Sequence, residues 1–276
     1  MVSYSSTFQC VFRSSCGIPP QANSTALPFP QGSTSIKPRS AGAVLRVAGN
    51  ADHFQVALVG NGDKEETLAV ASVYSSETGV WSNFVSTPLP PEDPALGYPT
   101  MISMDMEAVL AEDCLYWRLT DSYGSILEFD LGRQRMAVIP VPGEFDRIDC
   151  FRVMRADGGG LGLIFLSDFS AQLWKRNTDS DGVTSWVLGR TIEMDKLLHL
   201  DPEERGTLMI VGYAEDNNVA LLWTIGGLFM ISLDSSQFKK PLETCSLSHY
   251  HAFESVCTAE TGIGGGHNGA DLLHNT

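Results

Sequence analysis

Short apolar runs recur along residues 44–260 of the chain. Each run spans four to eight residues, is rich in Val, Leu, Ile, Phe, Tyr and Trp, and is bounded by Gly, Asp, Asn or Ser. Runs of this length between turn residues predict the strands of a sandwich, barrel or propeller. The runs that we assign to strands include Phe54–Val59, Leu68–Tyr74, Leu115–Leu119, Ser125–Leu131, Met136–Val141, Leu161–Leu166, Ala171–Trp174, Thr207–Gly212, Val219–Thr224 and Leu228–Leu233.

One segment has a helical period. Within Thr191–Leu200, the apolar residues Ile192, Met194, Leu197, Leu198 and Leu200 fit a short amphipathic helix of one or two turns. A parallel α/β fold needs a crossover helix between successive parallel strands, and one short helix cannot provide all of these crossovers. The pattern therefore predicts an all-β fold.

An internal repeat narrows the choice of fold. Four segments share one order of apolar strand, polar turn, second strand and longer linker; they are residues 54–81, 114–142, 161–189 and 219–243. Aligning Tyr74, Phe129, Trp174 and Ile231 gives spacings of 55, 45 and 57 residues. Four-stranded blades repeat every ~40–50 residues, with insertions in loops. The sequence thus predicts a β-propeller of the kelch-like type.

The expected number of blades follows from the length of the repeating region. At ~45 residues a blade, residues 44–260 hold about five short four-stranded blades. We expect a last strand at Ala252–Thr258 to complete a blade with N-terminal chain, and without it the ring is incomplete. Residues 1–43, rich in Pro and Ser, are expected to have little regular structure beyond a short strand at Phe8–Phe12, and residues 261–276 to form a flexible tail.

Turn residues and tryptophans occupy fixed places in the repeats. Turns rich in Gly, Asp and Ser separate the strand halves at 75–79, 132–134, 179–182 and 234–236. Such residues supply the positive φ or the local hydrogen bonds that hairpins need. The five tryptophans are Trp81, Trp117, Trp174, Trp186 and Trp223. We expect them to pack within and between blades, with an aromatic cage for a ligand as the alternative.

Composition and charge exclude several classes of protein. The chain is 43% hydrophobic and 18% charged, which excludes a largely disordered chain. Eighteen Lys and Arg stand against 33 Asp and Glu, a net charge of −15 that argues against nucleic acid as a partner. There is no ~18-residue apolar stretch, so no membrane partner is expected, and the N-terminus does not resemble a signal peptide.

The six cysteines give information about the cellular compartment of the protein. They are scattered without a paired CxxC, so no zinc finger is predicted; they are Cys10, Cys16, Cys114, Cys150, Cys245 and Cys257. We interpret them as reduced thiols of a cytoplasmic or nuclear protein. Because six is an even number, a disulfide framework is the alternative.

The sequence contains no motif typical of a catalytic or ligand-binding site. The chain lacks the nucleophile elbow, the zinc-protease motif and the phosphate-binding loop. Gly262–Gly269 lies in the tail, Asp179–Gly182 lacks the ligand spacing of a calcium loop, and the pair His249 and His251 has no third metal ligand. We therefore predict no catalytic, cofactor-binding or metal-binding residue, no cofactor and no enzymatic activity.

Five stretches of sequence carry a family resemblance: VYSSETGVW (73–81), LYWRL (115–119), ILEFDL (126–131), LWKRNTDSDGVTSWVLGRTIEMDKLL (173–198) and VGYAEDNNVALLWTIGGLFMISLDSSQFKK (211–240). Over residues 44–260 the chain resembles the C-terminal β-propeller of plant, especially grass, F-box proteins. In that family the F-box docks onto a Skp-type adaptor of a cullin ubiquitin ligase, and the propeller presents a protein substrate. Residues 1–43 lack the helical period of an F-box, so the adaptor is expected as a partner only if an F-box is supplied upstream.

The resemblance implies a non-catalytic protein-interaction module that recognises a protein substrate. Two alternatives remain open at the level of sequence. One is a propeller-fold enzyme acting on glycans, which would carry paired carboxylates on one face. The other is a truncated, non-functional paralogue that cannot close its ring.

Overall fold

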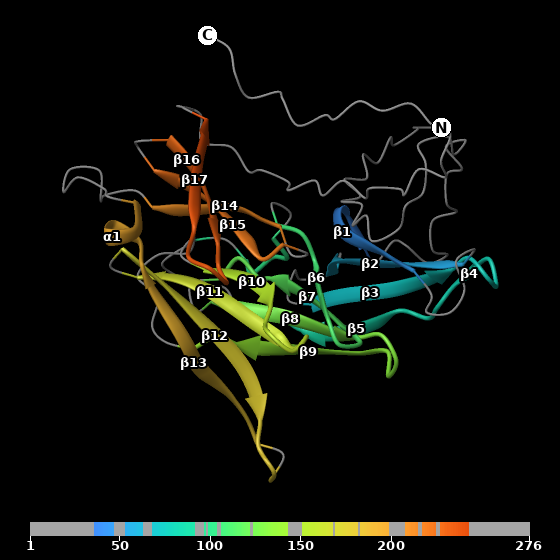
Figure 1. Cartoon of the computed structure of the whole chain (residues 1–276). Coiled ribbons are helices and arrows are strands. Elements are labelled where there is room, and N and C mark those ends of the chain that lie inside the picture. The colour runs from blue at the N-terminus through green and yellow to red at the C-terminus, as the bar shows by residue number, and fades with distance from the viewer. Residues whose placement is uncertain are drawn as a thin grey trace, which may run out of the picture.

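The computed structural model describes residues 36–46, 53–62, 68–91, 97, 99–103, 106–121, 124–142, 151–167, 169–181, 183–198, 208–214, 217–224 and 227–242. These residues form four antiparallel sheets in chain order and one helical turn, which confirms the all-β prediction. Figure 1 shows the sheets following one another from blue to orange along the chain. No strand pair links one described sheet to another, and the four described sheets do not close a ring.

The first sheet has five strands, and each later sheet has four. The first sheet contains β1 (Ile36–Arg46), β2 (Phe54–Gly62), β3 (Leu68–Ser75), β4 (Val80–Trp81) and β5 (Val85–Pro88). The second contains β6 (Val109–Ala111), β7 (Cys114–Arg118), β8 (Ser125–Asp130) and β9 (Arg135–Pro140). The third contains β10 (Phe151–Arg155), β11 (Leu161–Ser167), β12 (Ser170–Thr178) and β13 (Thr184–Glu193). The fourth contains β14 (Met209–Ala214), β15 (Val219–Thr224), β16 (Gly227–Ser232) and β17 (Phe238–Leu242).

The internal repeat corresponds to the sheets. The four residues aligned in the repeat all lie on the third strand of a sheet: Tyr74 on β3, Phe129 on β8, Trp174 on β12 and Ile231 on β16. The four polar turns each connect a third strand to a fourth. Gly79, Gln134 and Ser236 in these turns have φ angles of 71°, 50° and 53°, the left-handed conformation that the turn residues predict.

Three separate apolar clusters join the sheets in series. The first cluster packs strands of the first sheet against β7 and β8 around the fully buried Trp117. The second packs the second sheet against β10 and β11, with Trp174 and Trp186 at its edge. The third packs the third sheet and α1 (Met194–Leu198) against the fourth sheet around Ile164 and Ile231. Each sheet is thus held by its neighbour in the chain, as blades of a propeller are.

The remaining tryptophans also pack. Trp81 lies against Leu58 and Val70, and Trp223 lies against Leu221 and its neighbours. All five tryptophans therefore contribute to apolar packing, as the sequence predicts.

Two elements differ from the sequence-based expectations. The helix expected over Thr191–Leu200 is shorter, because Thr191, Ile192 and Glu193 pair with β12 and belong to β13. Strand β1 begins at Ile36, inside the segment for which little regular structure is expected. Its register with β2 shifts between Ile36 and Ser40, around Pro38, which cannot donate a ladder hydrogen bond.

Other expectations fall outside the described residues. These are the strands at Phe8–Phe12 and Ala252–Thr258 and the tail at 261–276. Four sheets are described where the sequence predicts about five blades. The part of the chain that is described has no helix with the length and apolar character to cross a membrane.

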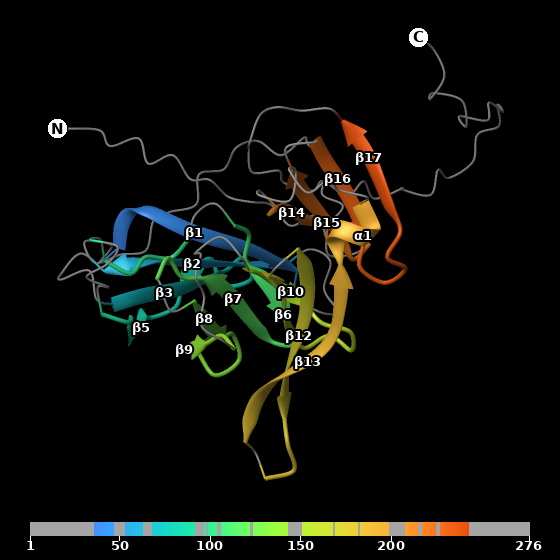
Figure 2. The same cartoon turned by 90° about the vertical axis from the view of Figure 1, so that its left-hand side faces the viewer.

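One hairpin extends beyond the rest of the fold. Strands β12 and β13 run past the other strands of the third sheet and end at a turn over residues 179–183. Figures 1 and 2 show this hairpin projecting away from the four sheets in two perpendicular views. Most of β13 is exposed.

Candidate functional site: a cleft between the third and fourth sheets

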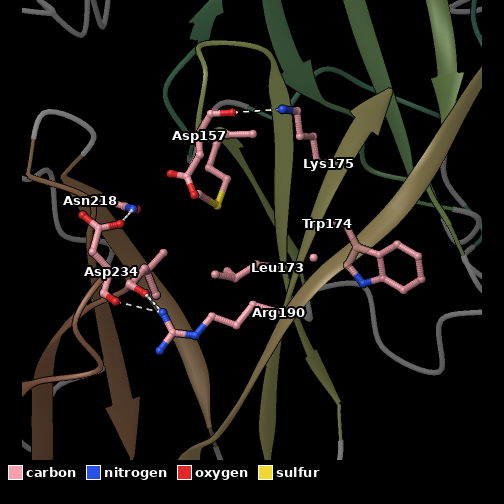
Figure 3. Close-up of a pocket in the computed structure, with 11 residues that line it drawn as sticks. Asp157, Leu173, Trp174, Lys175, Arg190, Asn218 and Asp234 are labelled. Atoms are coloured by element: carbon pink, nitrogen blue, oxygen red, sulfur yellow. Dashed lines mark hydrogen bonds between the residues drawn. The ribbon is translucent and has the colours of Figure 1, made fainter. Parts of the chain in front are cut away.

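A cleft of about 510 Å³ opens where the third sheet meets the fourth. Apolar side chains form much of its wall, and charged groups from both sheets stand at its sides (Figure 3). The residues that line it are Met154, Ala156, Asp157, Leu173, Trp174, Lys175, Gly189, Arg190, Asn218, Leu233 and Asp234.

Local backbone geometry creates this opening. The pairing of β12 with β13 shifts between Leu173 and Trp174, because Leu173 pairs with Arg190 whereas Trp174 pairs with Leu188. Gly189 is the extra residue of the bulge, and a bulge bends and twists a hairpin. The turn before β11 has Gly158 and Gly159 at φ angles of 87° and 91°, which side chains rarely adopt. These two glycines allow the tight turn that carries Asp157 to the cleft.

Arg190 joins the two sheets across the cleft. Its Nη1 donates to the carbonyl oxygens of Leu233 at 2.7 Å and Asp234 at 2.9 Å. Its Nη2 donates to Ser236 Oγ at 2.5 Å. All three acceptors belong to the turn between β16 and β17, so the planar guanidinium holds this turn against β13.

Three further hydrogen bonds fix the walls. Lys175 Nζ donates to the carbonyl oxygen of Asp157 at 3.1 Å, which ties β12 to the glycine turn. On the opposite wall, Asn218 Nδ2 donates to Asp234 Oδ1 at 2.5 Å, while Tyr213 Oη donates to Asn218 Oδ1 at 2.8 Å. Asn218 has a φ of 49°, which asparagine tolerates better than most residues.

The chemistry of the lining suits binding. Lys175 and Arg190 carry positive charge, Asp157 and Asp234 carry negative charge, and the described hydrogen bonds of both cations go to neutral oxygens. Among the described residues of the lining there is no Ser, Thr, Cys or His to serve as a nucleophile beside a base. The cleft offers apolar area and charges of both signs, which is the composition of a recognition surface.

Two arginines are buried where the second sheet meets β10, the first strand of the third sheet. Arg152 on β10 and Arg118 at the end of β7 are only 6% and 4% exposed. Burial lowers the pKa of Arg152 to about 10, with Glu107 opposing this shift and the charge of Arg118 adding to it. The guanidinium carbon of Arg118 lies 4.8 Å from the centre of the Phe151 ring. Both of these buried groups are therefore cations.

The thiol and phenol on β7 are also perturbed. Burial raises the pKa of the Cys114 thiol above its ordinary value, although a hydrogen bond with Tyr116 opposes the shift. Burial and the charge of Glu128 raise the pKa of Tyr116 as well. Both groups are therefore neutral at physiological pH, which makes Cys114 a poor nucleophile.

Aspartates in two hairpin turns accept hydrogen bonds that hold the turns together. Asp179 Oδ1 accepts the amide protons of Asp181 at 2.9 Å and Val183 at 2.8 Å, and so closes the β12–β13 hairpin rather than a calcium loop. Asp130 accepts from Arg133 in the β8–β9 turn, and the hydrogen bonds from Arg133 help to lower the pKa of its carboxyl.

The other candidates cannot be placed. His249, His251 and Gly262–Gly269 lie outside the described residues, as do all cysteines except Cys114. In the ranges that the structure describes, no three His, Cys, Asp or Glu side chains gather where they could hold a metal ion.

Sequence reasoning did not find the cleft. Its residues come from five places between positions 154 and 234, and their approach depends on how two sheets pack. One local signal was present: Arg190 places a positive charge between the apolar residues Leu188 and Ile192.

The family model described as "F-box protein AT5G49610-like, beta-propeller" matches residues 14–253, which is most of the chain. The match begins upstream of β1 and includes all four sheets. None of the curated proteins is similar enough to count as a match.

Proposed function

The chain belongs to the family of F-box protein AT5G49610-like β-propellers, and on this premise we propose that it is a non-catalytic protein-interaction module that recognises a protein substrate. The observation that carries the proposal is the family match over residues 14–253. The cleft supports it, because its apolar walls and fixed charges suit recognition.

The proposal includes a place in a ubiquitin ligase complex. In such a complex the propeller would hold the substrate, and a Skp-type adaptor would bind only through an F-box supplied upstream of this sequence. A cytoplasmic or nuclear location goes with this role. Nucleic acid is not the proposed partner, since the net charge is −15.

The test compares proteins captured by matched charge variants. Quantitative affinity purification from cells of the source organism would use three proteins: the full chain, its Lys175→Glu variant and its Arg133→Glu variant. Each recovered protein would then be purified, and its direct binding to the three chains would be measured. Lys175 lines the cleft, whereas Arg133 lies 79% exposed on the β8–β9 turn, so both variants make the same change of charge at different places.

We expect a small set of proteins that bind the wild-type chain directly and saturably. Their affinity should fall by about tenfold or more in Lys175→Glu and stay unchanged in Arg133→Glu. Failure of the wild-type chain to bind any protein directly would contradict the proposed function. Equal binding by Lys175→Glu would place the binding surface away from the cleft.

A further inference from the structure

The outer edge of the third sheet differs from the outer edges of the other sheets. An exposed edge strand offers unpaired N–H and C=O groups to any extended chain, and proteins usually protect such edges with charge, Pro or short length. The last strand of the fourth sheet contains Lys239, Lys240 and Pro241, and β9 begins with Arg135 and ends with Pro140. In the first sheet, β4 has two residues and β5 has four.

Strand β13 lacks these protections over half its length. It is ten residues long, and residues 184–189 contain no charge and no Pro. Within the described chain it pairs with β12 alone. Val187 is 48% exposed, Leu188 is 44% exposed and Val183 at the turn is 60% exposed. One hairpin thus holds three of the eight large apolar side chains that are exposed among the described residues.

The hydrogen bonds of the hairpin show which groups point outward. The amide of Asp179 donates to the carbonyl oxygen of Val183 at 3.0 Å. Because hydrogen-bonded and non-hydrogen-bonded pairs alternate in an antiparallel ladder, Ser185 and Val187 bond to β12. Thr184, Trp186 and Leu188 therefore direct their backbone N–H and C=O groups away from the sheet.

The two faces of this edge are different. Trp186 donates from Nε1 to the carbonyl oxygen of Pro140 at 2.9 Å, so its face lies against the second sheet. Val187 pairs with Lys175, which lines the cleft, so Val187 lies on the cleft side. A strand added beside β13 would therefore extend from the cleft, which Gly189 and Arg190 line, to the hairpin turn.

Charge selects the kind of occupant. The hairpin turn carries two exposed carboxylates, Asp179 and Asp181, next to the uncharged edge. The chain as a whole has a net charge of −15, which disfavours a second copy of itself at this edge. A segment with apolar β-branched residues beside Val187 and positive charge beside the two carboxylates fits both features.

We propose that β13 is a docking edge, on which an extended segment of a partner protein adds an antiparallel strand with its apolar residues beside Trp186–Leu188 and its Lys or Arg residues beside Asp179 and Asp181. Main-chain hydrogen bonds supply affinity in this mode, and the alternate side chains supply specificity. The proposal rests on the proposed function, since it names the way in which a protein-interaction module holds its partner.

The test uses a synthetic probe and two valine variants of the full chain. The probe is the labelled peptide Thr-Val-Thr-Ile-Thr-Val-Lys-Lys, whose C-terminal lysines reach the hairpin turn when it lies antiparallel to β13. The variants are Val187→Lys and Val80→Lys; Val80 is 61% exposed on β4 and is the matched control. The readouts are peptide affinity and hydrogen exchange of the chain at single-residue resolution.

We expect the peptide to slow exchange of the amides of Thr184, Trp186 and Leu188. Val187→Lys should weaken peptide binding by about tenfold or more, Val80→Lys should leave it unchanged, and replacing the two lysines of the peptide by aspartates should weaken it by a similar factor. No protection of these three amides at high peptide concentration would overturn the proposal. So would a wild-type dimer that Val187→Lys dissociates, since a second copy would then occupy the edge.

The two proposals fail in different ways. If a natural partner binds the wild-type chain and Val187→Lys binds it equally well, the docking edge is wrong while the interaction function stands. If no natural protein binds the wild-type chain, the function itself is wrong, whatever the peptide does.

Discussion

Replacing Arg190 by Ala removes the contact that holds the turn between β16 and β17 against the third sheet. The guanidinium makes three hydrogen bonds there, to the carbonyl oxygens of Leu233 and Asp234 and to Ser236 Oγ. A hydrogen bond from a charged donor contributes about 1.5–3 kcal/mol when it is shielded from water. Only the bond to Leu233 is partly buried, and the other two are exposed. We therefore expect Arg190→Ala to lose about 1–2 kcal/mol in total, far less than three shielded bonds would give.

The assay combines a thermal melt with hydrogen exchange. For a chain of this size a loss of 1 kcal/mol lowers Tm by about 2–4 °C, so we expect a fall of about 2–8 °C. Faster exchange should be concentrated in residues 227–242 and absent from the first sheet. Arg190→Lys keeps the charge but cannot form the fork, so it should recover less than half of the lost stability. An unchanged Tm, or exchange that rises equally in all sheets, would refute the reasoning.

Three further predictions concern packing, an ion pair and a thiol. A Cβ on Gly162 would lie 2.9 Å from Ala156 Cβ and 3.1 Å from the Trp174 carbonyl oxygen. Gly162→Ala should therefore cost about 1–3 kcal/mol in a denaturant melt, whereas Gly132→Ala, with its nearest contact at 3.6 Å, should change stability by less than about 0.5 kcal/mol. Arg176 and Glu128 form a half-buried 2.8 Å ion pair between the third and second sheets. A double-mutant cycle with Arg176→Met and Glu128→Gln should give a coupling free energy of about 0.5–1 kcal/mol that falls in high salt. Independent effects of the two substitutions on stability would contradict this prediction. Because the pKa of Cys114 is raised, its thiol should be alkylated more slowly in the folded chain than in the unfolded chain between pH 8 and 9. Peptide mass spectrometry measures both rates, and equal rates would contradict the raised pKa.

The third strand of each sheet and the turn that follows it could be predicted from the sequence. Their signals are local: a run of apolar residues, then Gly, Asp or Ser where the backbone turns. The aligned positions Tyr74, Phe129, Trp174 and Ile231 therefore fall on equivalent strands.

Several first and last strands of the sheets were harder to predict, although β9 and β14 correspond to the expected runs Met136–Val141 and Thr207–Gly212. Strand β6 has three residues, and β10 contains two arginines in five residues, so neither has the length or the apolar character of a typical run. Strand β13 is mostly exposed and shows no clear alternation. These strands form because a neighbouring strand pairs with them or a neighbouring sheet packs on them, which is information that a single segment does not hold.

The candidate site depended on the same long-range information. The cleft exists because the bulge at Gly189 bends the hairpin while Arg190 holds the fourth sheet beside it. Each residue type was visible in the sequence, but the distance between Asp157 and Asp234 in space was not.

The serial packing of the sheets has a consequence for synthesis of the chain on the ribosome. The first sheet is complete by residue 88, the second by 140, the third by 193 and the fourth by 242. Each of the first three sheets finds an apolar partner in the next ~50 residues to emerge, which takes about 3–10 seconds of translation at ~5–20 residues per second. The nascent chain can thus assemble in the order in which it is made, and its first three sheets need no segment from the far end to cover the clusters that join them.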